Sequence, residues 1–408
     1  MRLSKIFVGL TGALGLFPLL KLNHFSILMI VWFVMAIILG VKNKTFKNIK
    51  QHNITFLVLS FLSLMYFLYV PFASDYSEVF KSIIKSLPLL VFPIGFLVNK
   101  QLITDEVLSI FKKVFITSVF AINVFGWIKV FQFGIVEAFS KNDFYHPIFR
   151  NLFHEATSMH LPYLGLLSAF ATLWIIYEKI KSKQLKIYNL SLILFFLLSI
   201  YIYSARMALV GFIVCLVYLC LQSLTNKKLK FSLIIFIPII TVTIVYFSPL
   251  KERYTNLFSK ELVLPHKNQQ PHEVNYRYAI LYCTTNIIKD HFFIGVGPDN
   301  AQKSLNKCYD TFTYKSYEDF TKVTYNTHNQ YLDQMLKFGV IGLLLFLFSL
   351  FYFFKKIDVL YQVFMIMIAL SFLTENILDR QIGVVFFSLL NTMFVVRKLN
   401  SLEKSISS

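Results

Sequence analysis

The sequence predicts an all-α integral membrane protein, with about twelve transmembrane helices and one large loop between two of them. The first indication is composition: 56% of the residues are hydrophobic, only 15% are charged, and the mean hydropathy is +0.63. Soluble domains are about 45–50% apolar and about 25% charged. The second indication is that apolar stretches recur at the length a spanning helix needs, roughly 20 residues.

The apolar stretches follow one another along the whole chain, which we therefore expect to form a single membrane domain over residues 1–408. They lie at about 6–20, 24–41, 54–71, 83–98, 114–132, 159–177, 188–204, 207–222, 231–248, 334–354, 359–374 and 381–396. The first stretch is short and is also compatible with a re-entrant segment. Because it lacks a clear small-residue cleavage site, we expect a retained helix rather than a signal peptide.

The net charge of +19 is explained by membrane topology rather than by nucleic-acid binding. If the N-terminus is cytoplasmic and the twelve helices alternate, most Lys and Arg fall in inside segments, as in the run Lys42–Lys50. The short outside segments then hold only Lys21, Lys81, Lys141, Arg150, Arg206 and Arg380. Short cytoplasmic loops are rich in Lys and Arg, so both termini are expected in the cytoplasm.

Residues 249–328 form an 80-residue outside segment without an apolar spanning stretch. A loop of this length inside a compact protein is usually functional. Its cysteines, Cys283 and Cys308, would face an oxidising compartment, where a disulfide is possible; two free thiols are an equally open alternative. Cys215 and Cys220 lie within an apolar stretch and are interpreted as packing residues.

Three residues that suit one kind of chemistry fall on the outside face: Arg206, Arg277 and His328. Guanidinium groups bind diphosphate oxygens bidentately and stay charged, and histidine accepts a proton near neutral pH. Together they suit group transfer from a lipid diphosphate to a hydroxyl. Taken singly, each has a plainer interpretation: a snorkelling arginine, a solvated loop charge, and a histidine beside a helix cap from Thr327 or Asn329.

Further polar residues on the same face could support the site. Asn329 and Tyr331 follow His328 directly, and Glu375 and Arg380 flank the last outside turn, where they could instead pair with each other. Three other features are also present: an i, i+4 pair of Asp333 and Lys337, a turn at Gly295-Val296-Gly297, and a segment Tyr145–His160 with His146, His154, His160, Arg150 and Glu155. That segment is either an acceptor-side surface or an interfacial amphipathic loop.

In this order the motifs resemble the bacterial O-antigen ligase and O-antigen polymerase family of membrane glycosyltransferases. The resemblance covers mainly residues 200–396. It is carried by Ser204-Ala205-Arg206, by Arg277 leading to Gly295-Val296-Gly297, by His328-Asn329-Gln330-Tyr331-Leu332 before Gly339-Val340-Ile341-Gly342-Leu343, and by Thr374-Glu375-Asn376 through Gly383. Family members often have the serine directly before the arginine, whereas Ala205 intervenes here.

The resemblance implies a GT-C-like fold in the bacterial inner membrane, with a large periplasmic loop at 249–328 and an active site on the periplasmic face. Arg206 and Arg277 would hold the diphosphate of an undecaprenyl-diphosphate-linked glycan, and His328 would act as general base on the acceptor hydroxyl. No metal and no cofactor are implied. The acceptor would be lipid A core for a ligase, which we favour, or another glycan for a polymerase or a protein for an O-glycosylating relative. A transporter or flippase of lipid-linked glycans is the alternative of another class.

Overall fold

The computed structural model describes residues 2–139, 147–184, 186–203, 205–246, 263–265, 275–312 and 324–407. Within these ranges the regular structure is helical throughout, and the expected all-α membrane fold is confirmed. Ser204 and His146, which the sequence analysis singled out, lie outside the described residues.

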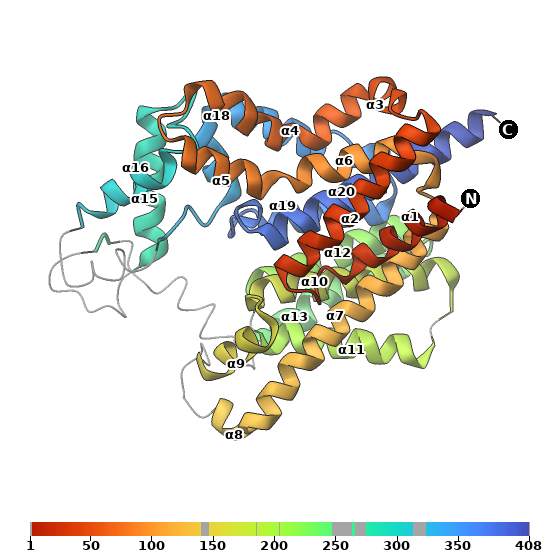
Figure 1. Ribbon diagram of the computed structural model, residues 1–408. Coiled ribbons are helices and arrows are strands. Elements are labelled where there is room, and N and C mark those ends of the chain that lie inside the picture. Colours follow the sequence, from red (N-terminus) through yellow and green to blue (C-terminus); the bar gives the residue numbers. More distant parts are fainter. Residues whose placement is uncertain are drawn as a thin grey trace.

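Each of the twelve expected stretches overlaps a helix (Figure 1). The first half contains α1 (Arg2–Ala13), α2 (Leu22–Asn43), α3 (Lys47–Gln51), α4 (Asn53–Tyr69), α5 (Tyr76–Ser86), α6 (Pro88–Val98), α7 (Asp105–Phe133), α8 (Ile135–Ala138), α9 (Pro147–Thr157) and α10 (Leu161–Ser182). The second half contains α11 (Ile187–Ile202), α12 (Arg206–Ser223), α13 (Lys227–Tyr246), α15 (Tyr276–Asp290), α16 (Ala301–Tyr309), α18 (Gln330–Phe351), α19 (Val359–Ser371) and α20 (Gln381–Ser407). Short 3₁₀ turns join several of them: η1 (Leu14–Leu16), η2 (Val70–Phe72), η3 (Lys100–Leu102), η4 (Phe354–Lys356) and η5 (Ile377–Asp379).

Among the described residues, eight helical segments are long and apolar enough to cross a membrane, counting α5 and α6 as one segment. The helices α11 and α19 are apolar but shorter. The expectation of about twelve spans therefore holds for the positions of the helices, while their lengths differ more than the apolar stretches indicated.

Polar side chains set where several helices begin. Asp75 accepts hydrogen bonds from the backbone N–H groups of Ser77 and Glu78 and so starts α5, and Thr104 caps α7 in the same way. Such caps satisfy donors that the first helical turn leaves without a partner. For this reason α5 begins at Tyr76, several residues before the stretch expected at 83–98.

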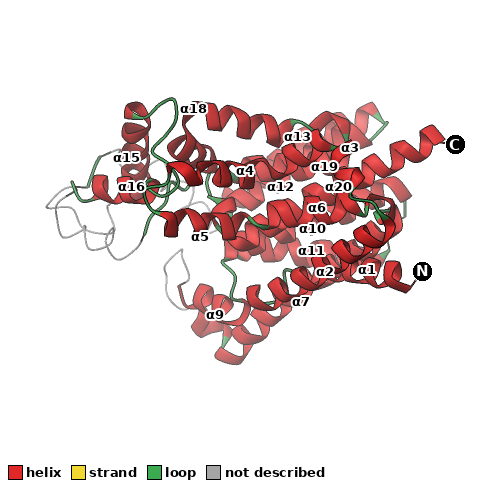
Figure 2. Cartoon of the chain, turned by 45° about the horizontal axis from the view of Figure 1, so that its top comes forward, coloured by secondary structure: helices red, strands yellow, loops and turns green. Residues whose placement is uncertain are grey.

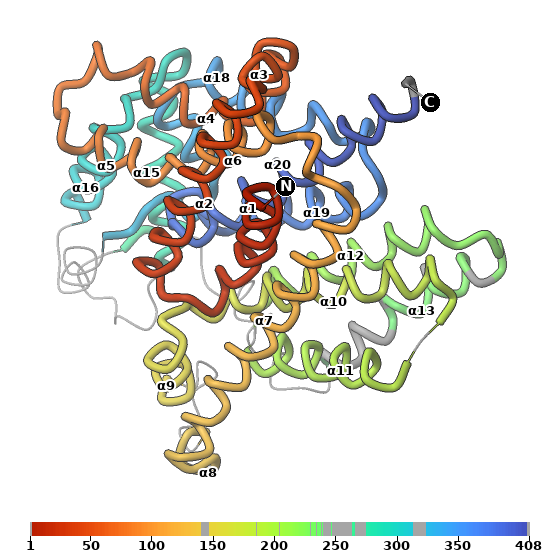
Figure 3. The backbone as a smooth tube through the Cα atoms, turned by 45° about the vertical axis from the view of Figure 1, so that its right-hand side comes forward, coloured from red at the N-terminus to blue at the C-terminus, as the bar shows by residue number. Residues whose placement is uncertain are grey.

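The helices α10 and α20 lie at the centre of the bundle, with 78% of the apolar stretch buried in each. The helix α12 packs between α10 and α19, and α6 packs on α20. Aromatic side chains fill the space between α10, α19 and α20. Phe170 of α10 lies against Trp174 of the same helix, Phe364 of α19 and Phe386 of α20, with ring centroids 5.2–5.9 Å apart. Figure 3 shows α7 leading out to α8 and α9 at the edge of the bundle.

The helices α15 and α16 form a small unit with a hydrophobic core of its own, which includes Ile280, Leu305 and Tyr309. A disulfide joins Cys283 of α15 to Cys308 of α16, so the first of the two open alternatives for these cysteines holds. Cys215 and Cys220 are buried and free, as expected for packing residues. Both chain ends lie at the opposite end of the bundle from α15 and α16 (Figures 1 and 2); we call the α15–α16 side the loop end.

The helix α18 is interrupted at Gly339, whose φ of +66° is left-handed. The segment 292–297 docks against this break: Val296 N–H donates to the Leu336 carbonyl at 2.8 Å, and Val340 N–H donates to the Phe292 carbonyl at 2.8 Å. A Cβ at position 339 would lie 2.1 Å from the Phe293 carbonyl oxygen, so only glycine permits the approach. The Gly295-Val296-Gly297 motif is thus a turn that anchors the loop to a broken helix.

Candidate functional site

A cavity of about 170 Å³ at the loop end brings together three of the expected site residues. Its lining includes Arg206 at the start of α12, Arg277 in the first turn of α15, and Glu375 between α19 and η5. It also includes Arg150 of α9, which lies in the Tyr145–His160 segment. Residues far apart in the sequence therefore meet in one small, cation-rich hollow.

Small residues bring Arg206 to the cavity. Gly165 of α10 faces Ala205 and Ala208 of α12, and a Cβ at Gly165 would lie 2.7 Å from the Ala205 Cβ. The two helix backbones can therefore approach closely at this point. Because Arg206 is the first residue of α12, this close packing of α12 against α10 positions Arg206 in the lining of the cavity.

Arg277 is positioned by the cap of α15. The Asn275 side chain accepts a hydrogen bond from Tyr278 N–H at 3.2 Å and so fixes where the helix starts. The neighbouring Tyr276 ring stacks on Tyr325, with centroids 5.7 Å apart. This contact ties the start of α15, and with it Arg277, to the segment that carries His328.

His328 lies immediately before α18 and has a left-handed backbone, with a φ of +47°. Its backbone N–H donates to Asn326 Oδ1 at 3.1 Å. Its ring nitrogen Nδ1 lies 3.8 Å from Glu375 Oε2, and this buried nitrogen has no hydrogen-bond partner among the described residues. His328 is thus linked through Glu375 to the cavity that the arginines line.

The residues around His328 are held against the end of α19. Asn329 caps α18 through Tyr331 N–H and Leu332 N–H, while its Nδ2 donates to the Leu373 carbonyl at 3.1 Å. The Tyr331 hydroxyl donates to the Ala369 carbonyl at 2.8 Å. Asn329 and Tyr331, expected as supporting residues, thus fix the backbone beside His328.

Arg380 and Glu375 face different histidines rather than each other. Arg380 Nη1 lies 3.4 Å from His160 Nε2, whereas Glu375 faces His328. The flanking residues of the last outside turn therefore belong to two adjacent hollows. Burial and the nearby positive charge of Arg380 lower the pKa of His160.

Of the two carboxylates that pair with Lys337, the sequence predicted only one. Lys337 Nζ lies 2.6 Å from Asp333 Oδ2, the expected i, i+4 pair, but also 3.0 Å from Asp379 Oδ1. Asn376 donates to Asp379 at 3.2 Å and also contacts Thr327, beside His328. This buried network joins α18 to the α19–η5 turn. Asp379 is 42 residues from Lys337 in the sequence, so no local sequence pattern predicts this pairing.

Arg150 and Tyr163 line the cavity, yet neither was given a specific role from the sequence. Arg150 was noted as one of the few basic residues in short outside segments and as part of the Tyr145–His160 segment, whereas Tyr163 gave no signal within its apolar stretch. Within the described ranges, no three His, Cys, Asp or Glu side chains are grouped to hold a metal ion.

Comparison with known proteins gives one match. Residues 190–347 match the family model described as O-antigen ligase. No curated protein matches the chain at a significant level. The matched region spans α11 to α18 and contains Arg206, Arg277 and His328. Residues 190–347 therefore carry the sequence pattern of the O-antigen ligase and polymerase family, and the resemblance expected from the motifs is confirmed.

Proposed function

We propose that this protein transfers a glycan from undecaprenyl diphosphate to a hydroxyl of lipid A core, as an O-antigen ligase does, on the periplasmic face of the bacterial inner membrane. The observation that carries the proposal is the single cavity lined by Arg150, Arg206 and Arg277, with His328 attached to it through Glu375. The Lys and Arg distribution and the position of both termini opposite the loop end support this orientation.

The arginines would bind the donor. Arg206 and Arg277 come from different helices, so their guanidinium groups can approach a diphosphate from two directions, each bidentately. Arg150 adds a third positive charge to the same lining. In this position they would also stabilise the negative charge that builds on the diphosphate as it leaves, which is the interaction that lowers the barrier most directly.

His328 would act as general base. The acceptor hydroxyl oxygen attacks the anomeric carbon, the bond from that carbon to the diphosphate oxygen breaks, and the hydroxyl proton passes to a ring nitrogen of His328. The products are the new glycoside and undecaprenyl diphosphate. Glu375, 3.8 Å from Nδ1, would orient the ring and favour Nε2 as the proton acceptor, the arrangement common to histidine bases paired with a carboxylate.

A transporter of lipid-linked glycans has some support in the fold, because broken helices and buried charges occur in transporters. Here, however, the break at Gly339 is filled by residues 292–297, and Lys337 is paired with Asp333 and Asp379. Contacts within the chain thus account for both features. The cavity lined by Arg150, Arg206 and Arg277 suits a diphosphate and so favours the enzyme.

The experiment is analysis of a deletion strain, with surface polysaccharide and undecaprenyl-linked glycans measured together. For a ligase we expect loss of capped lipopolysaccharide and accumulation of long lipid-linked chains. Accumulation of single repeat units without long chains would mean a polymerase instead. Complementation with wild type should restore the normal pattern, and complementation with His328→Ala should not. An unchanged glycan profile in the deletion strain would exclude both the ligase and the polymerase function.

A further inference from the structure

A second cavity of about 460 Å³ adjoins the arginine-lined cavity. Tyr163 lines both, so one aromatic side chain separates them. The second cavity lies among the segment before α2, the end of α9, and the starts of α10 and α20. We call it the histidine cavity, after His154 and His160 in its lining.

The histidine cavity is lined by cationic and hydrogen-bonding side chains. The rings of His154 and His160 stack with centroids 4.8 Å apart, and Arg380 Nη1 lies 3.4 Å from His160 Nε2. The other polar residues in its lining are Lys21, Asn23, Thr157, Ser158 and Gln381. No carboxylate belongs to the described residues that line it, which suits an anion rather than a cation.

The position of this cavity relates it to His328. Glu375, which faces His328 at 3.8 Å, lies close enough to His160 to act on it electrostatically, as Arg380 does from the other side. A molecule in the histidine cavity would therefore reach past Tyr163 toward the carboxylate and the imidazole. The arginine-lined cavity, with its 170 Å³, leaves little room for a second saccharide beside a diphosphate.

We propose that the histidine cavity binds a phosphate group of the acceptor saccharide, and so presents the attacking hydroxyl to His328 across Tyr163. Arg380 and Lys21 would hold the phosphate charge, and the histidines and Gln381 would complete its hydrogen bonds. The inference rests on the proposed function and adds a substrate class to it. Phosphate on a lipid A core saccharide and the diphosphate of a lipid-linked repeat unit share this chemistry.

The test is steady-state transfer by the purified full-length protein in vesicles, with donor and acceptor varied independently. For Arg380→Gln and Lys21→Gln we expect the KM for the acceptor to rise about tenfold or more, because a charged hydrogen bond is lost, while the KM for the donor stays unchanged. Lys81→Gln is the matched control: Lys81 lies near the same end but pairs with Glu78 at 2.6 Å. A rise in the donor KM with Arg380→Gln, or no change at all, would overturn the assignment.

A binding measurement keeps the two proposals separable. Binding of phosphorylated lipid A core is compared with its dephosphorylated form, and with a lipid-linked single repeat unit, in the absence of donor. Preference for a phosphorylated molecule that Arg380→Gln removes supports the histidine cavity, and the preferred molecule identifies the source of the phosphate. Equal binding of phosphorylated and dephosphorylated acceptor would reject it, whereas absence of transfer by wild type would reject the proposed function alone.

Discussion

The imidazole of His328 and the carboxylate of Glu375 face each other at 3.8 Å, from Nδ1 to Oε2, across 47 residues of sequence. His328 precedes α18 and Glu375 follows α19, so two helices and the turn between them bring the pair together. Glu375 also lines the arginine cavity. This carboxylate links the proposed base to the proposed donor site.

His328→Ala is expected to lower kcat for glycan transfer by about 10²–10⁴-fold, the usual contribution of a general base. Membrane insertion and expression should be unchanged, because the ring makes no hydrogen bond through Nδ1 that the fold depends on. His291→Ala is the matched control, since His291 is exposed and its ring nitrogen Nδ1 lies 3.2 Å from the Ile287 carbonyl of α15. Wild-type turnover by His328→Ala would exclude the base role.

Glu375→Gln keeps the side chain's size and removes its charge. We expect kcat to fall about 10–100-fold, because the negative charge that would stabilise the protonated imidazole 3.8 Å away is lost, with the donor KM little changed. The measurement is the kcat and KM of Glu375→Gln and Glu375→Asp side by side. Recovery of part of the loss by aspartate would separate the effect of charge from that of shape.

Arg277→Lys tests bidentate recognition of the diphosphate. Lysine preserves the charge but offers no planar pair of donors, so kcat/KM for the donor should fall about 10–100-fold, and Arg277→Ala should abolish transfer. Lys289→Gln, on the same helix near its C-terminal end, is expected to leave transfer unaffected. If lysine functions as well as arginine at position 277, simple charge neutralisation would replace the bidentate contact.

Reduction of the Cys283–Cys308 disulfide should loosen the α15–α16 unit. Closing a loop of 25 residues contributes about 3 kcal/mol to stability in the chain-entropy treatment. Thermal unfolding and limited proteolysis in detergent, with and without reductant, should therefore differ for wild type and not for Cys283→Ser/Cys308→Ser. Substitution of the buried thiols, in Cys215→Ala/Cys220→Ala, should leave the reductant effect intact.

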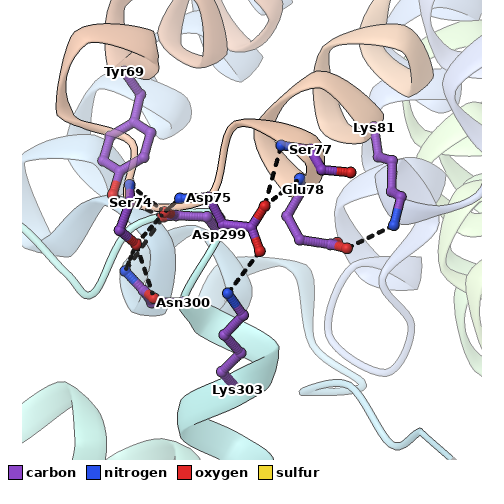
Figure 4. Close-up of polar contacts among 9 residues, drawn as sticks. All are labelled: Tyr69, Ser74, Asp75, Ser77, Glu78, Lys81, Asp299, Asn300 and Lys303. Carbon is purple, nitrogen blue, oxygen red and sulfur yellow. Dashed lines mark hydrogen bonds and ion pairs between the residues drawn. The ribbon is translucent and has the colours of Figure 1, made fainter.

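Asp299 gives the docking of the loop a pH dependence. Its carboxylate accepts hydrogen bonds from the Tyr69 hydroxyl, from Ser74 N–H and Oγ, and from Asp75 N–H, all at 2.7–2.9 Å (Figure 4). Burial raises the pKa of Asp299, but these hydrogen bonds lower it more, so the pKa is below its ordinary value of 3.8.

A lowered folded-state pKa means that the ionised carboxylate stabilises the folded state above about pH 4. That contribution is lost as pH falls through the lower, folded-state value. Asp299→Asn, which replaces the charged acceptor by a neutral amide with one acceptor oxygen, should cost about 2–3 kcal/mol at pH 7 and remove this acid sensitivity. The unfolding midpoint of Asp299→Asn in detergent is measured from pH 7 to pH 3. The control is Asp290→Asn, which removes an exposed carboxylate at the end of α15. An unfolding midpoint that is as sensitive to acid in Asp299→Asn as in wild type would contradict the assignment.

The helices could be predicted because a membrane-spanning helix requires a run of about 20 mostly apolar residues, which is visible in the local sequence. The stretch 24–41 has only His24 and Ser26 as polar residues, and no tertiary information is needed to find it. The ends of helices were less accessible, as at α5, where the Asp75 cap starts the helix at Tyr76 in polar sequence. The break in α18 was also hidden, because Gly339 is tolerated in a helix unless a partner such as residues 292–297 approaches it.

The candidate site, too, could be predicted from the sequence only in part. Arg206 could be selected because basic residues are few in the short outside segments, and Arg277 and His328 because they fall on the same expected face. Arg206 and Arg277 line one cavity. The partners of these residues were not predictable. Whether Glu375 would face Arg380 or His328 depends on the turn after α19, and the pairing of Asp379 with Lys337 depends on how α18 packs against it. Both are properties of the folded bundle alone.

The contact between Asp299 and the α4–α5 turn also determines when in its synthesis the protein can become complete. Tyr69 precedes Asp299 by 230 residues, so at about 5–20 residues per second the first half of the bundle waits on the order of 10–50 seconds for its partner. In the proposed orientation, the loop must also cross the membrane before it can dock. The early helices are therefore inserted with their polar docking groups open, and a chain stalled before residue 299 would be a membrane-embedded but unfinished molecule.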